Sequence, residues 1–204
     1  MRTRDQLYAY QKRAVDFVKQ NANCALWMDM GLGKSAVTMT AVTDLMERFE
    51  SRRALIVAPL RVARKVFSDE AREWDHLKHL RFSKIISDRR VRRSALIQPG
   101  EFHTVNRENL AWLVDTFFDD KGRQKRFWPY DTVILDESQS FMSQSALRWK
   151  KMRHVRKLFP RMIQLTGTPS PRKGYAALWA QMFLLDRGER LGRTEDAFRR
   201  RWFD

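Results

Sequence analysis

The stretch Asp29-Met30-Gly31-Leu32-Gly33-Lys34-Ser35 decides the fold of this 204-residue chain. Its two glycines allow a tight turn that brings backbone N–H groups against an anion. Lys34 can reach the outer phosphates of a nucleotide, and the Ser35 hydroxyl can ligate Mg²⁺. An apolar run precedes the stretch and a helix-like run follows it, so an anion here would face a positive helix N-terminus. The pattern predicts a phosphate-binding loop made of Met30, Gly31, Leu32, Gly33, Lys34 and Ser35.

An ordinary turn is the alternative interpretation of this stretch. The general phosphate-loop pattern has a further glycine five residues before Gly33, and this chain has Met28 there. The glycine stretch alone leaves both interpretations open, and the rest of the chain decides between them.

Short apolar, β-branched runs alternate with longer amphipathic segments along the whole chain. The expected strands are Cys24–Met28, Ala54–Ala58, Phe82–Ile86, Phe102–Val105, Thr132–Leu135 and Met162–Leu165. The expected helices are Gln6–Gln20, Lys34–Phe49, Arg61–Trp74, Arg89–Ile97, Glu108–Phe118, Ser145–Leu158 and Ala176–Leu185. This alternation predicts an α/β fold with a mostly parallel central sheet and helices on both faces. Such sheets bind ligands at the carboxyl ends of their strands.

Two further motifs directly follow expected strands. In Thr132–Glu137, a buried strand would push two carboxylates into a nucleotide site, where Asp136 would hold Mg²⁺ and Glu137 would position or deprotonate a water. The alternative is a strand end capped by a solvated acidic pair. In Leu165–Pro169, small hydroxyl residues around a glycine suit a switch loop that bonds to neighbouring carboxylates. A plain strand-to-helix turn is the alternative there.

Composition restricts the partners and the compartment. Forty Lys and Arg against 24 Asp and Glu give a formal charge of +16, which favours a polyanion partner and above all nucleic acid. A basic surface without an assigned partner is the alternative. One cysteine, Cys24, and four scattered histidines give no zinc-ligand spacing. The apolar runs are too short to span a membrane, so we expect a cytoplasmic protein (in the host cytoplasm if phage-encoded) without a membrane partner.

Together and in this order, the motifs resemble the first RecA-like half of a superfamily-two helicase of the Swi/Snf, chromatin-remodeller-like type, closest to phage-encoded relatives. Leu7–Gln11 resembles the family's Q motif, in which the glutamine (here Gln11) reads the adenine edge. Asp29–Ser35 matches motif I, the Walker A element, and Asp136–Gln139 matches motif II, the Walker B element. Leu165–Pro169 matches motif III. The matches extend over nearly the whole chain.

Two more matches concern nucleic acid and coupling. Leu55–Leu60 resembles motif Ia, followed by the family's spaced Glu70 and Trp74, and Val105–Asn109 resembles motif Ib. The resemblance implies that nucleic acid is contacted by Pro59, Leu60, Arg61, Arg64, Asn106 and Arg107. It also implies coupling between motifs II and III by Gln139, Thr166, Gly167 and Thr168. The chain departs from the family at three positions: Met28 for an acidic residue, Phe67 for a common tryptophan, and Gln139 for a histidine.

The resemblance implies one RecA-like domain over residues 1–204 that binds ATP and Mg²⁺, with Lys34, Asp136 and Glu137 as its catalytic residues. Such a lobe belongs to a motor that translocates along nucleic acid, with double-stranded DNA the favoured track. A second RecA-like lobe, in the same or another chain, would supply arginine fingers, whose loss costs about 10³–10⁵ in rate. This lobe alone is therefore expected to turn over ATP weakly or not at all.

Two other functions compete with the motor. A free-standing, non-catalytic module that binds ATP and DNA, or regulates another motor, would also fit a lone lobe. A small-molecule kinase with a phosphate loop is disfavoured, since it leaves motifs Ia, Ib and III and the charge unexplained. Three basic stretches are expected to be mainly solvated surface, with DNA contact as the alternative: Arg89–Arg93, Lys121–Arg126 and Arg148–Lys157.

Overall fold

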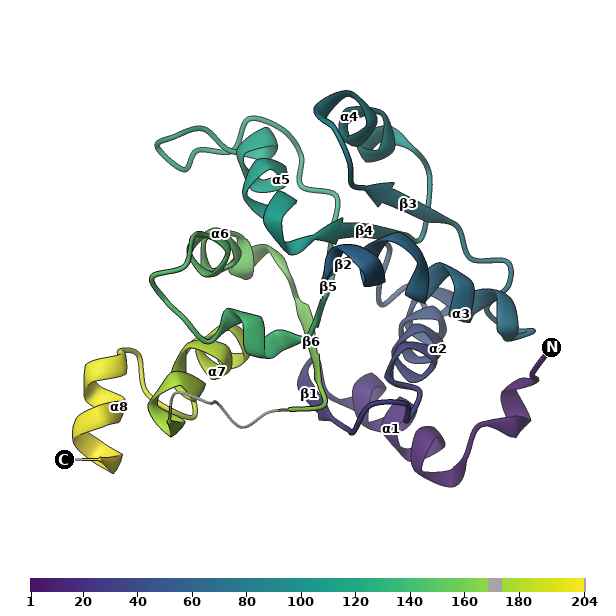
Figure 1. Ribbon diagram of the computed structural model, residues 1–204, viewed down its shortest axis with the longest axis horizontal. Helices are drawn as coiled ribbons and strands as arrows, with labels where there is room; N and C mark the ends of the chain where they lie inside the picture. The colour runs from purple at the N-terminus through teal and green to yellow at the C-terminus, as the bar shows by residue number, and fades with distance from the viewer. Residues whose placement is uncertain (169–173, 204) are drawn as a thin grey trace.

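A six-stranded parallel sheet forms the centre of the computed structural model, which describes residues 1–168 and 174–203 (Figure 1). The strand order is β1-β6-β5-β2-β4-β3. The strands are β1 (Asn23–Trp27), β2 (Ala54–Ala58), β3 (Phe82–Ile85), β4 (Phe102–Asn106), β5 (Thr132–Asp136) and β6 (Arg161–Thr166). Every expected strand is present within one or two residues of its expected bounds. The predicted α/β fold with a parallel sheet is confirmed.

The register of the ladders aligns the carboxyl ends of the strands. Trp27 of β1 lies opposite Thr166 of β6, and Asp136 of β5 lies opposite Leu165, which is also in β6. On the other side of the sheet, Ala58 of β2 is level with Asn106 of β4. The residues that follow these strands therefore emerge along one edge, where parallel α/β sheets bind ligands.

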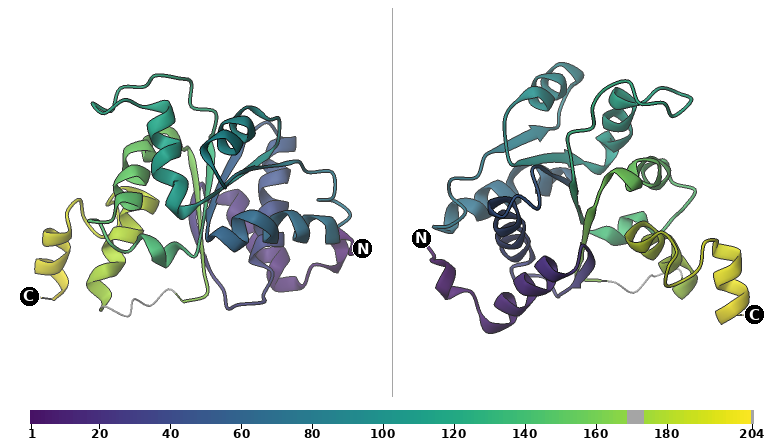
Figure 2. Two further views of the ribbon diagram at one scale, coloured as in Figure 1. Left: turned by 45° about the horizontal axis from the view of Figure 1, so that its top comes forward. Right: turned by 180° about the vertical axis from the view of Figure 1, so that it is seen from behind.

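Helices cover both faces of the sheet, as Figures 1 and 2 show. One apolar core joins the sheet to α1 (Ala9–Gln20), α2 (Lys34–Glu47) and α3 (Phe67–Glu73). A second core joins the other face to α5 (Leu110–Phe117), α6 (Leu147–Val155), α7 (Leu178–Asp186) and α8 (Glu195–Trp202), and half-buried residues of α4 (Arg89–Ile97) pack against its margin. None of the helices in the described part of the chain is long and apolar enough to cross a membrane.

Several elements differ from their expected bounds. The expected helix Gln6–Gln20 is broken at Leu7 and Tyr8, whose backbone is extended because Leu7 is buried in the core. The expected helix Arg61–Trp74 begins with a π-helical turn, η2 (Val62–Val66), before α3. The sequence analysis missed α8, although the Thr194 hydroxyl accepts a hydrogen bond from the Ala197 N–H as an N-cap. The short 3₁₀ turns are η1 (Arg4–Gln6), η3 (Arg107–Asn109), η4 (Ser138–Phe141), η5 (Arg156–Leu158) and η6 (Tyr175–Ala177).

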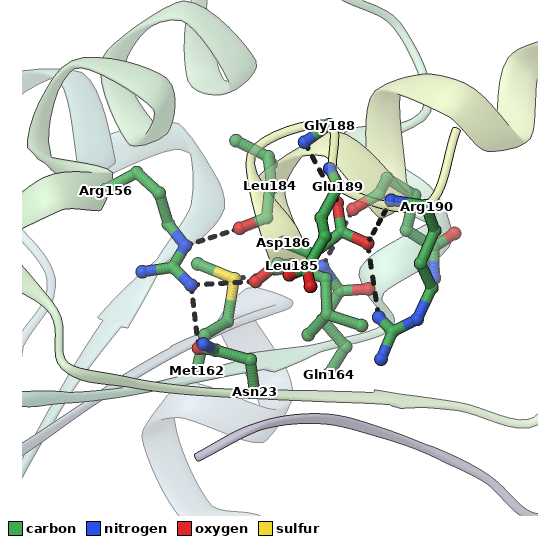
Figure 3. Close-up of polar contacts among 11 residues, drawn as sticks. Asn23, Arg156, Met162, Gln164, Leu184, Leu185, Asp186, Gly188, Glu189 and Arg190 are labelled. Carbon is green, nitrogen blue, oxygen red and sulfur yellow. Dashed lines mark hydrogen bonds and ion pairs between the residues drawn. The ribbon is translucent and has the colours of Figure 1, made fainter. Parts of the chain in front are cut away.

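A buried arginine attaches α7 to the sheet (Figure 3). The Arg156 guanidinium donates to the carbonyls of Leu184 and Leu185 at the end of α7, to its own turn at Phe159, and to Asn23 Oδ1 at the start of β1. Only 3% of Arg156 is exposed, and burial lowers the pKa of its guanidinium to about 10. The cation is stabilised by neutral oxygens at the negative end of a helix.

We expect Arg156→Met to lower the free energy of unfolding by about 3 kcal/mol, because carbonyls that lose their donor stay buried. Thermal unfolding followed by circular dichroism should show a Tm lower by roughly 6–12 °C. Lys157→Met, at the exposed neighbouring position, is the control and should change Tm little. Equal Tm values for the two variants would contradict the structural role of Arg156.

Candidate functional site

The phosphate-binding loop predicted from the sequence follows β1 as a tight turn. Gly31 and Gly33 have φ values of +81° and +77°, in the left-handed region that other residues rarely adopt. Gly33 is the N-cap of α2, so the first N–H groups of this helix point toward the turn. A Cβ atom at Gly33 would lie 2.4 Å from Gln11 Nε2. The two glycines are therefore required by backbone conformation, and Gly33 also by space.

Gln11 connects the Q-motif region to this turn. Its side chain accepts a hydrogen bond from the Tyr8 N–H (3.0 Å) and donates one to the Leu32 carbonyl (3.2 Å). The residue is buried, although its neighbour Tyr8 is 68% exposed and stacks on Tyr10 with 5.7 Å between ring centroids. Gln11 thus fixes the start of α1 against the glycine turn.

A pocket of about 630 Å³ opens beside the turn. The predicted residues Gln11, Gly31, Gly33, Lys34 and Ser35 line one part of it. The rest is lined by residues from the N-terminal segment, the start of α1 and the end of α3: Arg2, Gln6, Tyr8, Tyr10, Glu70 and Trp74. The Trp74 indole N–H donates a hydrogen bond to the Glu70 carboxylate at 2.9 Å. These are the two residues that follow motif Ia in the family resemblance. The volume lies in the range of small-ligand sites. Met30 and Leu32 contribute to the turn through their backbone and point their side chains outward.

Lys34, the first residue of α2, lies over the loop. Its ammonium group donates to the carbonyls of Met28 (2.7 Å) and Asp29 (2.9 Å). The same ammonium lowers the pKa of Asp136, whose strand β5 is separated from β1 only by β6. The glycine turn and the acidic motif, about a hundred residues apart in sequence, therefore lie at one site.

Asp136 is the charged group of this site that burial affects most. Burial, reinforced by the neighbouring Glu137 carboxylate, raises its pKa to about 6. At neutral pH the group is thus an anion that the protein itself stabilises poorly. A divalent cation would stabilise it.

The residues present fit Mg²⁺ bound together with phosphates. Mg²⁺ is usually held by one or two carboxylates or hydroxyls, with phosphate oxygens and waters as its other ligands. Asp136 and Ser35 are the candidate protein ligands. The described residues hold no cluster of three or more His, Cys, Asp or Glu that would bind a metal without a nucleotide.

Glu137 has an unusual backbone conformation, with φ +51° and ψ +54°. The left-handed region costs a non-glycine residue about 1–2 kcal/mol, and such strain is concentrated at functional sites. The Glu137 carboxylate accepts a hydrogen bond from the Gln139 side-chain amide. The sequence analysis identified this glutamate but gave no signal of its strain.

A chain of hydrogen bonds runs from Glu137 to motif III. The side-chain oxygen of Gln139 (Oε1) accepts a hydrogen bond from the Thr166 hydroxyl at 2.8 Å. The Thr166 hydroxyl in turn accepts one from the Thr168 N–H at 3.0 Å. Gly167 lies against the phosphate loop, since a Cβ there would be 3.4 Å from the Met28 carbonyl and the Met30 nitrogen. The structure therefore brings together the four predicted coupling residues. Pro169, the last residue of motif III, lies outside the described residues.

A second buried network supports motif II from behind, and the sequence analysis missed it. The Gln181 amide of α7 donates to the Ser138 hydroxyl at 2.8 Å, and the Gln164 amide of β6 donates to the Gln181 carbonyl at 2.9 Å. All three residues are fully buried. The only sign of this network in the sequence is that Gln181 and Gln164 stand within a largely apolar helix and strand. Because Arg156 holds the end of α7, it also helps to hold Ser138.

The predicted nucleic-acid residues follow β2 and β4 at the same edge of the sheet. Leu60, Arg61 and Arg64 are exposed, and Pro59 is half-buried. The π turn η2 contains Arg64, and the Thr104 hydroxyl of β4 donates to the Ala63 carbonyl of this turn at 2.7 Å. π turns within helices occur frequently at functional sites.

Asn106 and Arg107, at the end of β4, are less accessible to solvent than the exposed residues that follow β2. Asn106 is 6% exposed, and its amide donates to Glu108 (2.7 Å) and accepts from Asn109 (2.6 Å). Arg107 is half-buried, and its charge lowers the pKa of Asp136. Asn106 therefore organises the turn that carries Arg107.

Comparison with known proteins gives a family. Residues 4–171 match the family described as "Type III restriction enzyme, res subunit". A putative protein, p41, of Acyrthosiphon pisum secondary endosymbiont phage 1 is 38% identical over 201 residues, which cover 95% of this chain and 42% of that protein. The chromatin-remodeling ATPase INO80 of Arabidopsis thaliana is 27% identical over 189 residues, covering 88% of this chain and 12% of that protein.

Solved structures show the same fold. The SWI2/SNF2 ATPase core of Sulfolobus solfataricus in complex with dsDNA superposes with a TM-score of 0.72 and 23% identity, over 96% of this chain and 38% of that one. The core domain alone gives a TM-score of 0.66 and 24% identity, over 96% and 37%. This chain thus spans about two fifths of the phage protein and of the Sulfolobus cores. It belongs to the Type III restriction enzyme res-subunit family and has the RecA-like fold of a Swi/Snf-type lobe of superfamily-two helicases.

Proposed function

We propose that this chain is the ATP-binding lobe of a DNA-dependent ATPase motor of the helicase or double-stranded DNA translocase type. The observation that carries the proposal is the convergence at one sheet edge of a glycine turn with a left-handed backbone, a half-buried aspartate with a raised pKa and a strained glutamate. Family membership and the match to a Swi/Snf-type core support the same function.

In this proposal, the residues around the glycine turn bind and orient MgATP. The N–H groups of the turn and of the start of α2 bind phosphate oxygens, and the Lys34 ammonium exchanges its two carbonyl partners for the outer phosphates. Gln11 faces the base from the wall of the adjoining pocket. Mg²⁺ would supply charge neutralisation on the phosphates, with Ser35 and Asp136 as the protein residues that hold it.

Glu137 acts as the base, or as the residue that positions the attacking water. Its carboxylate is fixed by the Gln139 amide, and Gln139 in turn is fixed by Thr166. A movement of motif III would therefore reorient the carboxylate through two hydrogen bonds. Pro59, Leu60, Arg61, Arg64, Asn106 and Arg107 form the nucleic-acid surface beside it. Full turnover needs a second RecA-like lobe that adds arginines to the phosphate site, and this lobe alone hydrolyses ATP slowly.

We expect Lys34→Ala to weaken MgATP binding by about 100-fold or more, because a charge-assisted contact to phosphate is lost. Isothermal calorimetry with the purified chain measures this. Lys150→Ala removes an exposed lysine of α6 and is the matched control. Equal affinities of wild type and Lys34→Ala would remove the basis of the proposed site.

We expect Glu137→Gln to bind MgATP within about threefold of wild type and to lose about 10²–10⁴ in hydrolysis rate, because the amide cannot accept a proton from water. The rate is measured with DNA present in a protein that carries both lobes. Glu189→Gln, at an exposed position, is the control. Undiminished turnover in Glu137→Gln would exclude this residue as the base.

We expect Arg61→Glu/Arg64→Glu to weaken binding to a DNA duplex by at least about tenfold and to reduce the salt slope by about two ions, since each phosphate contact releases about one counterion. Fluorescence anisotropy at several salt concentrations measures both quantities. Arg13→Glu/Arg48→Glu makes the same charge change at two exposed positions, one in α1 and one directly after α2, and is the control. Equal losses in both variants would show that only net charge matters.

A further inference from the structure

A second large pocket lies between α4 and α5, away from the glycine turn. Its volume is about 540 Å³. Its lining residues on α4 recur with helical spacing from Arg89 to Ile97, and those on α5 run from Trp112 to Thr116. Figure 1 shows the two helices next to each other over β4 and β3, with the 119–127 loop projecting beyond the end of α5. We call this site the α4–α5 pocket.

The walls of the α4–α5 pocket are strongly basic. Arg89 and Arg93 line it from α4, and Lys125 and Arg126 line it from the loop after α5. All four are exposed, and within the described residues none of them forms an ion pair with a carboxylate. The one acidic lining residue, Asp115, is bound by Lys151. The pocket therefore presents uncompensated positive charge from two sides.

The pocket also presents an aromatic ring and aliphatic side chains. Trp112 and Leu96 are half-buried, and Ile97 is 81% exposed. The Arg92 guanidinium lies 4.4 Å from the centroid of the Trp112 ring, which fixes the ring in place. A basic channel with a fixed aromatic ring is the arrangement by which proteins bind single strands, with phosphates on the cations and a base on the ring.

The α4–α5 pocket is linked to the turn after β4. Arg92, which holds Trp112, also donates to Asn109 Oδ1, and the Asn109 amide donates to Asn106. A ligand on Trp112 would therefore contact a ring whose neighbour, Arg92, belongs to the hydrogen-bond chain that organises the turn carrying Arg107.

We propose that the α4–α5 pocket binds a single-stranded segment of nucleic acid, as a site separate from the proposed duplex surface around Arg61 and Arg64. This inference rests on the proposed DNA-dependent function. A single strand fits better than a duplex because stacking on Trp112 requires an unpaired base. It fits better than an acidic protein because the cations line the same pocket as a ring that can stack on any base.

The test uses Arg89→Glu/Arg93→Glu in the full chain, with Arg13→Glu/Arg48→Glu as the control of equal charge. The probes are a fluorescein-labelled oligo-dT of about 16 nucleotides and a duplex of the same length. We expect the pocket variant to bind the oligo-dT at least about tenfold more weakly than the control variant, with a salt slope smaller by about 1.4. An oligonucleotide with 5-iodouracil should cross-link to Trp112 under ultraviolet light.

Other outcomes overturn the inference. Equal oligo-dT affinities of the pocket and control variants would do so, as would cross-links confined to residues 59–64 and 106–107. A loss that is larger for the duplex would assign the pocket to double strands instead. Poly-glutamate at equal charge is the competitor that tests for an acidic protein partner. Such a partner would be indicated if poly-glutamate displaced the oligo-dT and if the pocket variant lost poly-glutamate binding. Failure of the proposed function is distinguishable, because it appears as a normal duplex affinity in Arg61→Glu/Arg64→Glu.

Discussion

The parallel register between β1, β6 and β5 is the constraint on which the candidate site depends. It sets Trp27 level with Thr166, and Asp136 level with Leu165. The phosphate loop, motif III and motif II therefore begin at the same edge, within two strand spacings or about 10 Å. Since side chains alternate along a strand, a one-residue slip of β5 would turn Asp136 to the other face and expose its apolar neighbours. The buried residues of β5 thus hold the acidic pair in place.

Much of the site's chemistry consists of arrangements that are unfavourable for the protein alone. Glu137 is held in the left-handed region, and burial raises the pKa of Asp136. Lys34 neutralises part of this charge while its hydrogen bonds go to backbone carbonyls. A metal-bound triphosphate has the charge pattern that would stabilise both side chains, because its phosphates are anions for Lys34 and its metal is a cation for Asp136. The packing that stabilises these arrangements lies elsewhere, in the Ser138–Gln181–Gln164 network and around Arg156.

The sequence predicted what is encoded locally. Apolar runs located all six strands, and the glycine spacing located the turn after β1. The sequence could not predict features that depend on distant contacts, such as Gln181 with Ser138, 43 residues away, or Arg156 with Asn23, 133 residues away. The strain at Glu137 also depends on the surrounding packing, because an acidic pair after a strand has no special backbone preference. The role of each predicted site residue remains a prediction, whereas the placement of the glycine turn and the acidic pair at one edge of the sheet is a property of the fold.

Arg107, directly after β4, is linked to motif II through its charge. Its Nε atom is buried and has no hydrogen-bond partner among the described residues, and its guanidinium lowers the pKa of Asp136. An anion that engaged Arg107 would reduce this effect, so Asp136 would need its metal more strongly. Asn106 and Asn109 set the position of Arg107, and Arg92 extends the same chain to Trp112. In the proposed function, phosphate groups bound beside Arg107 would therefore weaken the favourable charge that Asp136 receives from it.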